Sequence, residues 1–111
     1  MCYFIEEWKH RPAWIAMSPE DRGKFLFDLA PVIQRLVDEG AELLGYCVDG
    51  AHHGDMSRFL RIWRVPDQGF AGRIEAALAE TGWHTFFEPG ESRGEVLTPQ
   101  VAIHYLVNPN K

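Results

Sequence analysis

Two residues of opposite charge, Glu6 and Arg61, occupy matching places in two similar segments. Phe4–Trp8 has the sequence F-I-E-E-W, and Arg58–Pro66 has the sequence R-F-L-R-I-W-R-V-P. Both alternate apolar and charged residues with a period of two, which is typical of strands. On adjacent antiparallel strands, Glu6 and Arg61 would share one face and pair. Arg61 is then a candidate to bind a carboxylate, phenolate or enolate, with Glu6 as orienting group or base; the alternative is a structural salt bridge.

Aromatic side chains accompany this pair. Four have the same strand parity as Glu6 and Arg61, and a fifth comes from the strand predicted over residues 41–49. They are the predicted substrate-binding residues, lining a site for a small apolar or aromatic ligand: Phe4, Trp8, Tyr46, Phe59 and Trp63. Trp83 follows a helix end, where an aromatic residue either lines a pocket or fills the core.

Histidines supply the other candidate chemistry. His52 and His53 lie in a polar connector, G-A-H-H-G-D-M-S, with Asp55 beside them. His53 is a candidate general base, because imidazole titrates near neutral pH; the alternative is a solvated loop. Adjacent histidines in an extended segment point to opposite sides, and the two cysteines have no C-x-x-C spacing, so we predict neither a metal site nor a cofactor.

The elements that must position these residues follow from periodicity and helix-end signals. Ser18-Pro19 begins a helix and Gly40 is placed to end it, with Pro31 expected to kink or split it. Asp67 can cap a second helix that ends at Gly82. The predicted strands are 2–9, 41–49, 58–66 and 83–88, with an irregular link at 10–17, a glycine-rich turn at 89–94 and a terminal element at 98–106.

This order, β-α-β-β-α-β with a tail, predicts one ferredoxin-like α+β domain over residues 1–111. Right-handed crossovers give a four-stranded antiparallel sheet with the first and third strands in the middle. Both helices then cover the same face of the sheet. We expect Tyr3, Ile5, Leu60 and Ile62 to face the helices, which leaves the aromatic set on the free face. An apolar free face must be covered, so we predict a homodimer formed through Phe4, Trp8, Phe59 and Trp63.

Composition excludes several classes of partner. The 111 residues carry a net charge of −5 without a basic block, so no nucleic acid is expected. No run approaches the roughly 18 apolar residues of a membrane span. Acidic residues follow the start of the chain where a secretion signal would be apolar, which predicts a cytoplasmic protein. Cys2 and Cys47 are then expected as two buried thiols rather than a disulfide.

The order of elements and three stretches, M-C-Y-F-I-E-E-W-K, R-I-W-R-V-P-D and A-E-T-G-W-H-T-F-F-E, resemble small bacterial proteins of the dimeric α+β-barrel superfamily. That group includes antibiotic-biosynthesis monooxygenases, polyketide cyclases and darcynin-like proteins. The resemblance implies a homodimer whose sheets enclose a barrel. It favours a small-molecule-binding protein, as a cofactor-free oxygenase, cyclase or isomerase acting on a planar substrate; the alternative is a non-catalytic binding or structural module. Haem-binding members typically carry a histidine on the second helix, and Gln68–Thr81 contains none.

Overall fold

A computed structural model describes residues 2–48 and 56–109 of the chain. The elements follow one another as β1 (Cys2–His10), α1 (Pro12–Ala16), α2 (Pro19–Asp38), β2 (Glu42–Cys47), β3 (Arg58–Val65), α3 (Phe70–Glu80), α4 (Trp83–Phe86), β4 (Phe87–Glu95) and α5 (Pro99–Val107). The segment predicted as an irregular link therefore contains the short helix α1.

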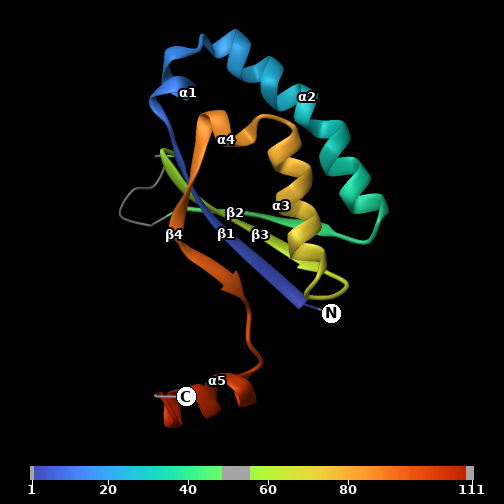
Figure 1. Cartoon of the computed structure of the whole chain (residues 1–111), viewed down its shortest axis with the longest axis vertical. Helices are drawn as coiled ribbons and strands as arrows, with labels where there is room; N and C mark the ends of the chain where they lie inside the picture. Colours follow the sequence, from blue (N-terminus) through green and yellow to red (C-terminus); the bar gives the residue numbers. More distant parts are fainter. Residues whose placement is uncertain (1, 49–55, 110–111) are drawn as a thin grey trace.

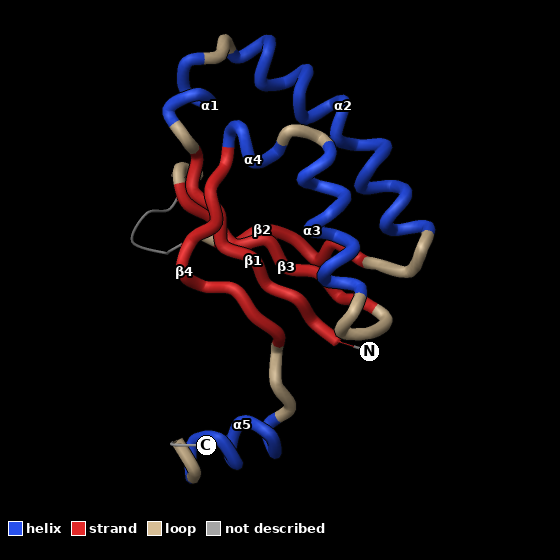
Figure 2. The backbone as a smooth tube through the Cα atoms, viewed as in Figure 1, coloured by secondary structure: helices blue, strands red, loops and turns tan. Residues whose placement is uncertain are grey.

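One antiparallel sheet organises the fold. Its strand order is β2-β3-β1-β4, so β1 and β3 lie in the middle as predicted. α2 and α3 lie on the same side of the sheet, and no helix among the described residues packs on the opposite face (Figures 1 and 2). This is the ferredoxin-like α+β arrangement that the element order predicted.

The long helix α2 begins and ends where the sequence signals placed it. The Ser18 hydroxyl accepts a hydrogen bond from the Asp21 amide at 3.1 Å, and Gly40 follows the helix with a φ of 118°. Pro31 was expected to kink or split the helix, and the split is wrong, because α2 continues through Pro31. Pro31 and Phe27 are both exposed. Phe27 lies four residues before Pro31, so its carbonyl loses its amide donor, and the exposed position leaves water as the alternative donor.

The face assignment was also wrong. Trp8 and Trp63 are 1% and 0% exposed, and Phe4 and Phe59 are buried with them beneath the helices. The opposite face carries the aliphatic set, on which Tyr3 is 36% exposed and Ile5, Leu60 and Ile62 are half-buried. Helix residues complete the core against the aromatic side chains: Leu29, Leu36, Phe70, Ile74, Ala77 and Leu78. The aromatic face is therefore internal and does not form a dimer contact.

The segment after α3 differs most from the prediction. Residues 83–88 were expected as a strand, but Trp83–Phe86 form α4, and β4 runs through the predicted turn at residues 89–94. β4 is an edge strand beside β1, where Pro89 and the glycines are tolerated because an edge strand makes hydrogen bonds on one side only. A register shift between Glu6 and Trp8 marks an irregularity in this pairing.

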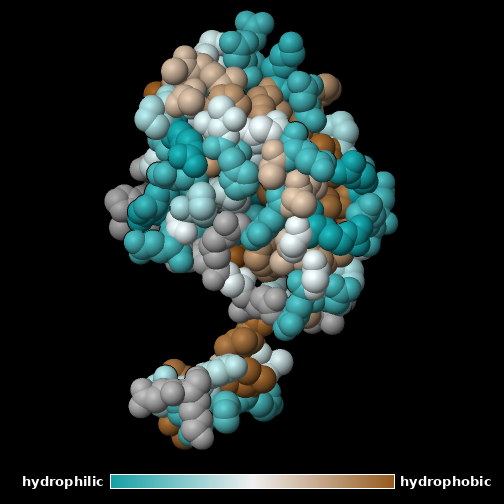
Figure 3. Space-filling view, in the orientation of Figure 1, coloured by the Kyte–Doolittle hydropathy of each residue, from teal (hydrophilic) through white to brown (hydrophobic). Residues whose placement is uncertain are grey.

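The predicted terminal element is a helix, α5, which stands apart from the body of the molecule (Figures 1 and 3). Cys2 and Cys47 are free thiols. Cys2 is half-buried, but Cys47 is exposed on the edge strand β2, so the expectation that both are buried was wrong.

Candidate functional site

Glu6 and Arg61 form a buried ion pair at the centre of the sheet. They are direct cross-strand partners on β1 and β3, as the alternating pattern predicted. Arg61 Nε donates to Glu6 Oε2 at 2.7 Å, and both side chains are 0% exposed. Trp63 Nε1 donates to the same oxygen at 3.1 Å. Two donors converging on one oxygen suit an ionised carboxylate, and they fix its orientation.

Arg61 lies in a cage of three tryptophan rings. Its Cζ atom is 4.6 Å from the centre of the Trp83 ring and 5.9 Å from the centres of the Trp8 and Trp63 rings. Its terminal nitrogens, Nη1 and Nη2, are buried and have no hydrogen-bond acceptor among the described residues. Buried donors without an acceptor are costly, and donors on a guanidinium especially so. The cage therefore presents unused donors to any acceptor that enters it.

Trp83 is the main residue of this site that the sequence analysis did not place among the ligand-binding residues. Its ring stacks on Phe87 with the centroids 4.1 Å apart and the planes 18° from parallel. Its Nε1 is also buried and has no acceptor in the described part of the chain. Gly82, with a φ of 85°, turns the chain between α3 and α4 just before it. The Gly-Trp pair after a helix is the signal that could have marked this residue.

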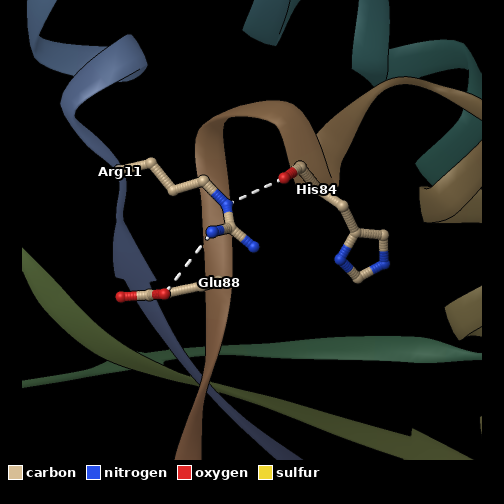
Figure 4. A network of polar contacts seen from close by, with 3 residues as sticks. All are labelled: Arg11, His84 and Glu88. Carbon is tan, nitrogen blue, oxygen red and sulfur yellow. Dashed lines mark hydrogen bonds and ion pairs between the residues drawn. The ribbon is translucent and has the colours of Figure 1, made fainter.

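α4 is held in place from two sides by Arg11, which follows β1. Arg11 Nε donates to the His84 carbonyl at 2.9 Å, and its Nη1 lies 3.4 Å from Glu88 Oε2 (Figure 4). The Arg11 amide donates to the Phe86 carbonyl at 2.7 Å. The His84 ring packs on Trp8, with centroids 5.4 Å apart. These contacts fix α4 to the end of β1 and so hold Trp83 over Arg61.

A cavity of about 390 Å³ lies between α2 and α3. Phe25, a lining residue, also faces the buried cage, because its ring lies 6.5 Å from that of Trp83 and 29° from parallel to it. The cavity thus adjoins the cage through the Phe25–Trp83 contact. Its full lining is Phe25, Asp28, Leu29, Val32, Arg35, Ala77, Glu80 and Thr81.

The predicted ligand-binding residues divide into two groups. Phe4 pairs with Trp63 and Trp8 pairs with Phe59 across the central strands, so these four surround the ion pair. Tyr46 is 52% exposed and reaches the group only at its edge, where its ring contacts Phe59 with centroids 5.6 Å apart. The fold therefore gathers four of the five predicted residues around the ion pair, under the helices and away from the free sheet face.

The histidine candidates cannot be placed in the same way. His52, His53 and Asp55 lie outside the described residues. Within residues 2–48 and 56–109, no three His, Cys, Asp or Glu side chains come together to hold a metal ion. α3 carries no histidine, so the haem ligand typical of the resembled family has no counterpart on this helix.

The fold and the site together define a ferredoxin-like α+β protein with a buried arginine–carboxylate pair inside an aromatic cage. The chain belongs to a family of unknown function, DUF6616, whose model matches residues 1–109. The search of curated proteins gave no match. In the described part of the chain, no helix combines the length and apolar character that crossing a membrane requires.

Two solved structures are similar to the chain. One is a candidate chlorite dismutase, with a TM-score of 0.65, 17% sequence identity and 94% of this chain covered. The match covers 48% of that protein, so the chain spans about half its length. The other is an uncharacterised NIPSNAP domain protein from Burkholderia xenovorans, with a TM-score of 0.41, 17% identity, and 89% of this chain and 94% of that chain covered. The first likeness supports the ferredoxin-like fold alone.

Proposed function

We propose that this protein binds a small planar anion against Arg61, in the tryptophan cage beneath the helices. The proposal rests on the burial and the incomplete hydrogen bonding of the Arg61 guanidinium. It is fully buried, it uses Nε for Glu6, and its two terminal nitrogens have no acceptor among the described residues. A ligand oxygen in the cage would supply the missing acceptor and offset the cost of those buried donors.

The chemistry of the cage indicates the class of ligand. Nη1 and Nη2 form a planar fork, which matches the two oxygens of a carboxylate or a single phenolate or enolate oxygen. The flat faces of Trp83 and its neighbours favour a planar or aromatic skeleton on the same ligand. The nearby Trp83 Nε1 is a further unused donor. A planar carboxylate, phenolate or enolate satisfies all of these groups together.

The route into the cage would run through the cavity between α2 and α3. Phe25 lines that cavity and lies against Trp83, and Trp83 covers the guanidinium. A rotation of the Trp83 side chain would join the cavity to the cage. α4 is a four-residue helix, and the rotation would break the stacking of Trp83 on Phe87.

Glu6 would give such a site a catalytic function as well. In a cofactor-free isomerase or cyclase, its carboxylate would take the proton from a carbon next to a carbonyl group, and Arg61 would stabilise the enolate oxygen that forms. The alternative is a structural pair. The second donor on Glu6 Oε2, from Trp63, favours that alternative because it locks the carboxylate in place.

Benzoate and its neutral analogue benzamide test the proposal. Three of the four tryptophans surround Arg61, so tryptophan fluorescence reports directly on the cage. We expect millimolar benzoate to change the fluorescence and raise the melting temperature, and benzamide to do neither. Arg61→Met should abolish the response, whereas the control Arg73→Met, on the exposed surface of α3, should retain it. Equal responses to both compounds, or none to benzoate, would overturn the proposal whether or not Arg61→Met folds.

A further inference from the structure

The C-terminal helix α5 is apolar, and no other described element packs extensively against it. It has nine residues, and none of residues 96–107 carries a formal charge apart from the titratable His104. Its large side chains are exposed on several sides, and so are those of the connector that leads to it: Val96, Leu97, Val101, Ile103, Tyr105, Leu106 and Val107. Figure 3 shows this apolar segment beyond the body of the molecule.

Such a helix needs a packing partner to persist in water. Helices shorter than about 12–15 residues are marginal by themselves. α5 nevertheless has a well-formed start, with Pro99 in its first turn and the Thr98 hydroxyl accepting from the Val101 amide at 3.3 Å. It makes no extensive contact with any other described element. The described part of this chain therefore offers α5 no extensive packing surface.

The open face of the sheet has the complementary property. Ile5 and Ile62 are cross-strand partners at its centre, and Leu60 lies opposite Cys47 of β2. Ion pairs flank this apolar centre, Arg64 with Glu42 near one end and Arg58 with Glu7 near the other. An apolar centre with a charged rim is the usual anatomy of a protein interface.

We propose that these two surfaces belong together in a symmetric homodimer, in which α5 of each chain docks on the open sheet face of a second copy. The connector after β4 carries α5 away from the body of the molecule (Figure 1), and the helix makes no extensive contact with its own sheet. With two-fold symmetry, α5 of each chain docks on the sheet of the other chain. Both helices and both open sheet faces are then covered in one closed dimer. A different protein partner would leave one surface of each chain uncovered.

Charge is compatible with a second copy as the occupant. With a net charge of −5, two copies repel each other through most of their surfaces. The proposed contact limits that repulsion, because α5 carries no carboxylate, the centre at Ile5 and Ile62 is uncharged, and the neighbouring Glu7 is paired with Arg58. This dimer uses the face opposite to the one that the sequence analysis chose.

Light scattering on the full-length protein tests the arrangement. We expect a dimer at micromolar concentration, and a monomer for Ile103→Glu and for Ile62→Glu, each with an unchanged circular dichroism spectrum. The control Phe27→Glu, at an exposed apolar position on α2, should remain dimeric. A monomeric wild type, open assemblies that grow with concentration, or α5 variants that stay dimeric would each overturn the proposal.

Cys47 on β2 offers a second test that does not depend on dissociation. In a Cys2→Ser background, Ile103→Cys should form a disulfide with Cys47 of the second copy under mild oxidation. The product is a covalent dimer on a non-reducing gel, and Cys47→Ser should prevent it. Phe27→Cys in the same background is the control, and it should give far less dimer. Equal cross-linking by both variants would contradict the docking of α5 on the sheet face.

Discussion

Glu6 and Arg61 are 55 residues apart in the chain and face each other across β1 and β3, with Arg61 Nε 2.7 Å from Glu6 Oε2. Removing one member of a fully buried pair leaves the other charge unmatched. We therefore expect Glu6→Gln and Arg61→Met each to lower the free energy of unfolding by about 3–5 kcal/mol, and the double variant to recover much of the loss. Urea denaturation of the four proteins measures this coupling.

The surface pair of Glu39 and Arg73 is the matched control, since both side chains are well exposed. Its double-mutant cycle should give a coupling of at most about 1 kcal/mol. Additive losses in the buried cycle would mean that the two charges are not energetically coupled. Near-neutral single variants would instead indicate a site whose charges are kept for binding at the expense of stability.

Gly90 on β4 lies against the side chain of Glu7, and a Cβ atom at this position would overlap with Glu7 Cγ and Cδ. Gly90→Ala should therefore destabilise the protein by about 1–3 kcal/mol through overpacking. Gly94→Ala is the control on the same strand, because its added methyl group would meet nothing within 4 Å. Thermal unfolding of the two variants should separate them, and Glu7→Ala should relieve the loss in Gly90→Ala.

Trp83 joins α4 to the rest of the core through Phe87, Phe25 and the guanidinium of Arg61. Because the side chain is 2% exposed, Trp83→Ala should leave a cavity and cost about 3–5 kcal/mol of stability. Trp83→Phe keeps the stacked ring and should cost much less. Chemical denaturation of both variants measures the difference, and equal losses would show that the stacking contributes little.

Gly72 in α3 is a position where a substitution should help. A Cβ atom there would meet nothing within 4 Å, and the residue has ordinary helical geometry. Gly72→Ala should raise the free energy of unfolding by about 0.5–1 kcal/mol, because alanine loses less backbone entropy on folding. Gly82→Ala should do the reverse, since the φ of 85° at Gly82 strains any residue with a side chain. Differential scanning calorimetry of the two variants checks both signs.

The strand pairing could be predicted because period-two alternation fixes the register of two adjacent strands. The equivalent places of Glu6 and Arg61 in their segments led directly to their observed pairing. Helix ends could also be predicted, because their signals are local in sequence, as the caps at Ser18 and Asp67 show. The path of residues 83–95 was not predictable in this way. W-H-T-F-F-E has strand-like composition, yet the turn at Gly82 and the contacts of Arg11 hold its first half as a helix.

The sequence by itself determined the order of elements, the central strand pair and the grouping of the aromatic side chains on one face. Only the tertiary structure decided which face the helices cover. Both faces of the sheet are apolar, so composition does not distinguish them. A shift of one residue in each strand would exchange the side chains on its two faces, and the helices would then cover the other set. That choice placed Arg61 in a buried cage with Trp83 and left the face of Ile5 and Ile62 open, so both proposed sites depend on it.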